Sequence, residues 1–126
     1  MREIVSTDKA PAAIGPYSQG IKAGGFVFTS GQLPLDVASG SLEVEDIQNA
    51  TRYCLENVKA IVERAGSSMD KIVKVVVFLK DMNDFSKMNE VYESFFKENP
   101  PARSCIEVAS LPKNVTIEIE AIAQLS

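Results

Sequence analysis

The sequence contains no histidine, and it has only two cysteines among its 126 residues. Without histidine the chain cannot form a serine–histidine triad, a cysteine–histidine nucleophile or a histidine-ligated zinc site. Cys54 and Cys105 lie far apart in the sequence, so there is no Cys-x-x-Cys motif, and neither of the glycine-rich phosphate-binding motifs is present. Any catalysis must therefore rest on Arg, Glu, Asp, Lys, Tyr, Ser, Cys or backbone amides, and we expect neither a metal nor an organic cofactor.

Long apolar runs and a basic surface are also missing. The longest apolar run, Ile72–Leu79, includes Lys74 and is far too short to span a bilayer, and no apolar signal segment follows Met1. The formal net charge is −4, with acidic and basic residues interspersed, so we expect no nucleic-acid partner. Reduced cysteines and a cytoplasmic location are the corresponding expectations.

Hydrophobic periodicity indicates a mixed order of helices and strands. Apolar residues recur at three- and four-residue steps in two segments, which predicts amphipathic helices, whereas β-branched and aromatic runs predict strands. The helices are expected at Val44–Ala65 and Asp84–Lys97. The strands are expected within Ile21–Leu33 (two, broken at Gly24-Gly25) and at Ile72–Leu79, Arg103–Val108 and Val115–Ala123.

This order predicts a single α+β domain over residues 1–126, with both helices packed on one face of a sheet. The strand Ile72–Leu79 is apolar on both alternations, so its second face also needs a cover. Because no third helix is available, we expect self-association through the sheet into a closed homo-oligomer.

The last two strands carry the most suggestive polar pattern. Alternation places Arg103 and Cys105 on one face of their strand, and it places Glu118 and Glu120 together on one face of theirs. An arginine can hold a substrate carboxylate through paired hydrogen bonds, and a nearby glutamate can then transfer protons. On periodicity alone, however, solvent-facing glutamates and a weak surface ion pair are the favoured interpretation.

Other candidate residues are equally open at this stage. Tyr17 lies in a loop rich in proline and glycine, where it is either a loop anchor or a hydrogen-bond donor to a ligand. Ser30-Gly31 is most simply a strand end, although a hydroxyl beside a bare backbone also suits close ligand approach. Without a base at hand, Cys105 is better interpreted as a small buried residue than as a nucleophile.

The motifs resemble those of the reactive intermediate deaminase family (RidA, also called YjgF), in order and over essentially the whole chain. The matching blocks are Ala10–Gly20, Thr29–Gln32, Asn57–Val62, Phe78–Phe85, Pro101–Ala109 and Ile117–Ala123. This resemblance implies a chorismate-mutase-like α+β fold and a homotrimer whose sheets turn inward. It also implies active sites in clefts between subunits.

The resemblance also implies residue roles. Arg103 would clamp a substrate carboxylate together with the backbone N–H of Cys105, and Glu118, rather than Glu120, would orient or deprotonate the attacking water. Tyr17 would donate a hydrogen bond near the reacting centre. The remaining pocket residues would be Ser30, Gly31 and Asn89.

The implied reaction is hydrolysis of 2-imino acids, in equilibrium with their enamines, to 2-keto acids and ammonia. The implied substrates are 2-iminobutanoate and 2-iminopropanoate, which need no metal or cofactor for their hydrolysis. Two alternatives stay open, namely a regulatory protein that binds a small ligand in the same cleft without turnover, and an endoribonuclease or translation inhibitor. The acidic composition argues against the latter.

Overall fold

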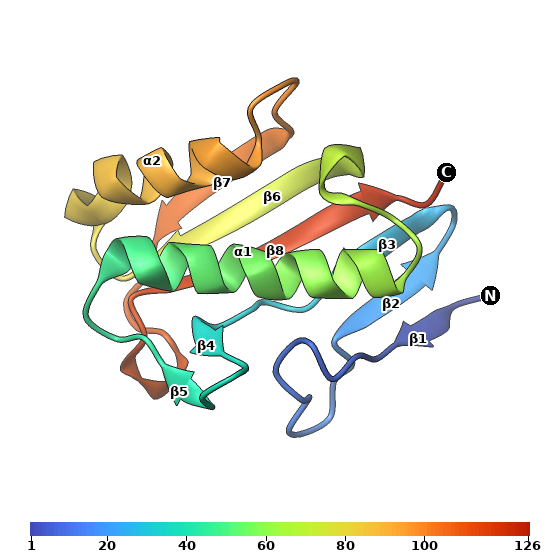
Figure 1. The fold of residues 1–126 in the computed structure, drawn as a ribbon, viewed down its shortest axis with the longest axis horizontal. Coiled ribbons are helices and arrows are strands. Elements are labelled where there is room, and N and C mark those ends of the chain that lie inside the picture. Colours follow the sequence, from blue (N-terminus) through green and yellow to red (C-terminus); the bar gives the residue numbers. More distant parts are fainter.

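A six-stranded mixed sheet forms one layer of the protein in the computed structural model, which describes residues 1–126 (Figure 1). The strand order is β1-β2-β3-β8-β6-β7, in which only β6 and β7 run parallel. The bounds are β1 Glu3–Val5, β2 Gly20–Ala23, β3 Phe26–Thr29, β6 Ile72–Leu79, β7 Ala102–Glu107 and β8 Ile117–Gln124. A small separate hairpin pairs β4 (Leu35–Asp36) with β5 (Ser41–Leu42).

Two helices cover one face of this sheet (Figure 1). Helix α1 spans Ile47–Arg64 and starts later than its apolar stripe suggests, because the Asp46 carboxylate accepts hydrogen bonds from the second and third residues of the helix. Gly66, with φ of 94°, lets the chain leave the helix. Helix α2 spans Phe85–Phe95 after a 3₁₀ turn at 82–84, and two further 3₁₀ turns lie at 69–71 and 112–114.

The core lies between the helices and the sheet as one cluster of 22 buried residues. Alternation decides which strand residues enter it: Val75, Val77 and Leu79 of β6 are buried, and so are the odd-numbered residues of β8 from Ile117 to Ala123. Each valine, leucine or isoleucine side chain among them contributes about 1.5–3 kcal/mol when it is fully removed from water. The helical face of the sheet is thus the closed one.

The opposite face of the sheet remains partly open within one chain. Val76 and Phe78 of β6 are only half-buried, and Phe28 and Ile106 are 42% and 44% exposed. The sequence predicts that both faces of Ile72–Leu79 are buried. Within one chain only the face towards the helices is buried. An apolar band remains for another surface to cover.

The expected α+β fold, with two helices on one face of a mixed sheet, is confirmed. Sequence reasoning missed β1 and the β4–β5 hairpin, because strands of two or three residues carry too little periodicity to be recognised. A turn at residues 37–40 connects the two strands of that hairpin. Neither helix has the length and apolarity that crossing a membrane requires.

Candidate active site

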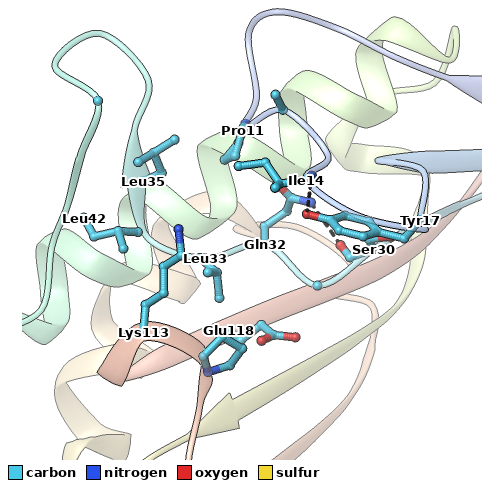
Figure 2. Close-up of a pocket in the computed structure, with 14 residues that line it drawn as sticks. Pro11, Ile14, Tyr17, Ser30, Gln32, Leu33, Leu35, Leu42, Lys113 and Glu118 are labelled. Carbon is cyan, nitrogen blue, oxygen red and sulfur yellow. Dashed lines mark hydrogen bonds between the residues drawn. The ribbon is translucent and has the colours of Figure 1, made fainter.

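A cavity of about 650 Å³ opens beside the start of β8. Its walls come from the N-terminal loop, the segment that follows β3, the β4–β5 hairpin and the 3₁₀ turn at 112–114. Figure 2 shows Glu118 on the β8 side of this cavity, with Tyr17 and Ser30 to one side of it and Leu42 and Lys113 to the other. The cavity thus gathers segments that are far apart in the sequence around one carboxylate.

Glu118 is the one carboxylate that lines this cavity. It is half-buried, and burial raises the pKa of its carboxyl above the ordinary value, with a further upward contribution from the negative charge of Glu120. Gly31 packs directly against it, because a Cβ at position 31 would lie 2.7 Å from the Glu118 carboxyl carbon. A raised pKa brings a carboxyl closer to the range in which it can both take and give a proton near neutral pH.

Tyr17 reaches the cavity from a tight turn in the N-terminal loop. Its backbone N–H donates to the carbonyl of Gly15, whose φ of 120° suits glycine. The side chain is 51% exposed, and the phenolic oxygen accepts only a long, 3.4 Å hydrogen bond from the Ile14 N–H. The phenol O–H is therefore available to a ligand.

Ser30 ties that loop to the sheet. Its hydroxyl donates to the carbonyl of Ser18 at 2.5 Å, and its backbone N–H donates to the carbonyl of Gln19 at 2.8 Å. The buried Gln19 side chain in turn bonds the backbone of Thr7, Ala10 and Pro11. Ser30 thus lines the cavity, and the hydrogen bonds from its hydroxyl and its backbone N–H hold the loop in place.

Arg103 lies outside this cavity, on edge strand β7 beneath helix α2. Its Nη1 donates to Oδ1 of Asn89 at 2.7 Å, and its guanidinium carbon lies 4.6 Å from the ring centre of Tyr92 and 5.4 Å from that of Phe85. No carboxylate neutralises it, since the only ion pair of the chain joins Lys22 to Glu3. Asn89 thus holds Arg103 and lies with it outside this cavity.

Cys105 follows Arg103 on the same face of β7 and is half-buried. Burial raises the pKa of its thiol, an effect that the nearby Arg103 charge partly opposes. The thiol is therefore protonated near neutral pH, which agrees with a role for its backbone N–H rather than for a thiolate nucleophile.

The structure corrects the sequence hypothesis that Arg103 lies near both glutamates within one chain. Strand β6 separates β7 from β8, and Arg103 pairs with Val75 on the buried, helical face of the sheet. Glu118 pairs with Phe78 on the open face. One chain thus brings together Tyr17, Ser30, Gly31 and Glu118, and separately Arg103, Cys105 and Asn89.

Sequence reasoning missed the far wall of the cavity. This wall is lined by Leu33, Leu35, Leu42 and Lys113. Lys113 lies in the turn before β8 and has a φ of 56°. A Pro-Lys-Asn turn directly before the strand that carries Glu118 was the available signal. No group of three or more Cys, Asp or Glu side chains is placed to hold a metal ion.

Comparisons with known proteins identify the family of the chain. The family model described as Endoribonuclease L-PSP matches residues 7–125. A RutC family protein of Pyrococcus horikoshii is 57% identical over 123 residues, or 98% of both chains. The 2-iminobutanoate/2-iminopropanoate deaminase of Salmonella typhimurium is 56% identical over 126 residues, again 98% of both.

Among solved structures, Escherichia coli TdcF with bound serine superimposes with a TM-score of 0.93 at 51% identity, covering 98% of this chain and 99% of that one. The fold of this chain is therefore shared with that relative over nearly its whole length. The resemblance read from the motifs is confirmed, and the chain belongs to the Endoribonuclease L-PSP family, which includes reactive intermediate deaminases.

Proposed function

We propose that the protein hydrolyses 2-imino acids, such as 2-iminobutanoate and 2-iminopropanoate, to 2-keto acids and ammonia. The observation that carries this proposal is the half-buried Glu118 carboxyl, whose pKa is raised and which packs against Gly31 in an open cavity. A proton carrier of this kind is what addition of water to a C=N bond requires. The 56% identity to a deaminase named for this reaction supports the choice of substrate.

Arg103 supplies the second requirement, which is a site for the substrate carboxylate. Its guanidinium is half-buried, has no anionic partner in the chain and is oriented by Asn89. A planar guanidinium can bind a carboxylate through two parallel hydrogen bonds. The backbone N–H of Cys105, two residues along the same strand face, would add a donor.

A homotrimer would bring these two halves of the site together. Arg103 and Glu118 lie on opposite faces of the sheet in one chain, so each site would combine Arg103, Cys105 and Asn89 from one subunit with Glu118, Tyr17, Ser30 and Gly31 from the next. The apolar band around Phe28, Phe78 and Ile106 supplies a surface for that association. The resemblance to the family supplies the number three.

The reaction then needs only proton transfers. The enamine takes a proton at C3 to become the imine, and water adds to C2 while Glu118 accepts a water proton. The resulting carbinolamine expels ammonia after the nitrogen gains a proton, which returns the C=O group of the keto acid. The phenol of Tyr17 donates a hydrogen bond near C2, and acid–base assistance of this kind contributes about 10²–10⁴-fold.

A second candidate is a binding protein that holds a small amino acid or related carboxylate without turnover. The serine bound in the TdcF structure favours it. Arg103 alone would explain such binding, so replacing Glu118 would leave affinity unchanged. The description of the family model names an endoribonuclease, but the net charge of −4 is unfavourable for binding RNA.

The test generates 2-iminobutanoate from threonine with a PLP-dependent dehydratase and follows release of 2-ketobutyrate. We expect faster release with wild type. Glu118→Gln is expected to lower kcat, and Arg103→Ala to raise KM. Glu56→Gln, which changes an exposed carboxylate on α1 that does not line the cavity, is the matched control. No acceleration by folded wild type would favour the binding protein, and RNA cleavage would favour the nuclease.

A further inference from the structure

We propose that Tyr92 is a positioning residue for Arg103. The face of the Tyr92 ring stabilises the substrate-binding guanidinium in place of a counter-ion. This inference rests on the proposed carboxylate clamp, and it extends the site to helix α2. The ring centre of Tyr92 lies 4.6 Å from the guanidinium carbon, closer than that of Phe85 at 5.4 Å. Both distances are within the range of cation–π attraction.

A half-buried cation needs such stabilisation, because burial without a partner is costly. An internal carboxylate would satisfy it but would also occupy the hydrogen-bond donors that a substrate carboxylate must use. Aromatic faces attract the cation and leave its edge N–H groups free. Asn89 uses Nη1 and thereby fixes the plane of the guanidinium. The result is a cation that is held in place yet still lacks an anion.

The hydroxyl of Tyr92 contributes little to this arrangement. It is buried without any hydrogen-bond partner, and the side chain is 6% exposed. Burial raises the pKa of the phenol to about 12, so it stays neutral at every working pH and never neutralises Arg103. The ring, and not the hydroxyl, is therefore what Arg103 uses, and Tyr92→Phe is the natural matched variant.

The fold places the ring beneath the guanidinium through ordinary helix geometry. Phe85, Asn89 and Tyr92 follow one another at four- and three-residue steps along α2, so all three face β7. Phe96 packs against Tyr92 with ring centres 4.7 Å apart and an angle of 41° between the ring planes. One face of one short helix thus supplies the hydrogen bond and the two aromatic contacts that orient Arg103.

The experiment measures KM and kcat for 2-iminobutanoate, together with the Kd of 2-ketobutyrate by calorimetry, in Tyr92→Leu, Tyr92→Phe and Phe85→Leu. For Tyr92→Leu we expect KM and Kd to rise on the order of tenfold with a smaller change in kcat. Tyr92→Phe should restore values near those of wild type. Phe85→Leu, which removes the more distant ring and leaves Tyr92 in place, should raise KM by a smaller factor. If Tyr92→Leu does not fold, Tyr92→Met removes the ring with a larger aliphatic side chain and is expected to raise KM and Kd in the same way.

The matched control is Tyr53→Leu on helix α1. The ring centre of Tyr53 lies 4.8 Å from the guanidinium carbon of Arg52, so this variant removes a similar cation–π contact without changing the surroundings of Arg103. Its KM and Kd should not change. Unchanged constants in folded Tyr92→Leu would overturn the role of the ring, and so would a Tyr92→Phe variant as impaired as Tyr92→Leu. If wild type binds 2-ketobutyrate but does not hydrolyse the imine, the proposed function fails while the Kd series still decides the role of Tyr92.

Discussion

Arg103 and Glu118 project from opposite faces of the same sheet, separated by the central strand β6. Each has its own set of neighbours: Arg103 has Asn89 and Tyr92 of helix α2, and Glu118 has Gly31 and the cavity. A reaction that needs both groups at one substrate must therefore take them from two chains. This separation makes the assembly a condition of the proposed activity.

A subunit-mixing experiment tests that condition. Arg103→Ala and Glu118→Gln are each expected to lose most activity when assayed alone. When the two variants are unfolded together and refolded at equal ratio, some interfaces combine an intact Arg103 from one subunit with an intact Glu118 from the other. Random mixing would give roughly a quarter of the wild-type sites.

Recovered activity at about that level would establish the shared site. Each variant refolded alone serves as the control, and their masses in light scattering confirm that both still assemble. No recovery from mixed trimers, or activity in a monomeric protein, would contradict a site between subunits.

The separation of these two residues also shows where sequence reasoning ends. The periodicity of α1 and the β-branched run of β6 fix those elements locally, and strand alternation correctly assigns Arg103 and Cys105 to one face. The register that β7 and β8 each make with β6 decides which residues of the two strands share a face of the sheet. These strands are distant in the sequence, so the alternation within one strand does not reveal its register with another.

The wall opposite Glu118 could not be predicted for a similar reason. Leu33, Leu35 and Leu42 look like ordinary loop and strand residues, and only the closure of the β4–β5 hairpin brings them to the cavity. Tyr17, Ser30 and Gly31 could be proposed because their motif is distinctive. Their common location next to Glu118 is a property of the fold.

The raised pKa of Glu118 predicts a pH dependence of stability. A carboxyl that binds its proton more tightly in the folded than in the unfolded state destabilises the fold once it is ionised. This penalty is absent below the ordinary glutamate pKa and grows as pH rises from there through the raised pKa. Glu118→Gln removes the penalty, so its advantage in free energy of unfolding over wild type should increase with pH across that window.

Urea unfolding at several pH values between 4 and 8 or so measures this difference. Glu56→Gln, at an exposed position on α1, should show no comparable trend. An advantage of Glu118→Gln that shrinks as pH rises would mean that the pKa of Glu118 is lowered rather than raised.

Gly31 is predicted to act through Glu118. A methyl group at position 31 would meet the Glu118 carboxyl group and displace it, so Gly31→Ala should lower kcat on the order of tenfold or more while the protein remains assembled. The effect should disappear in a Glu118→Gln background, because the proton carrier is already lost there. A double-mutant cycle on kcat measures this coupling. Additive losses would show that Gly31 matters for another reason.

Gln19 is predicted to anchor the loop that carries Tyr17. Its buried side-chain amide accepts a hydrogen bond from the Thr7 N–H and donates to the carbonyls of Thr7, Ala10 and Pro11. Gln19→Ala leaves several of these groups without a partner, which costs about 2–3 kcal/mol of unfolding free energy. The same change should lower kcat, because Tyr17 is positioned through this loop.

Gln48→Ala is the matched control, since that side chain makes one exposed hydrogen bond to the Lys87 carbonyl and should cost less than about 0.5 kcal/mol. Chemical denaturation and the imine assay measure both effects in the same preparations. A Gln19→Ala protein that loses stability but keeps full kcat would separate the anchor from the site. In that case the loop would hold Tyr17 by its own tight turn at Gly15, and Gln19 would serve the fold alone.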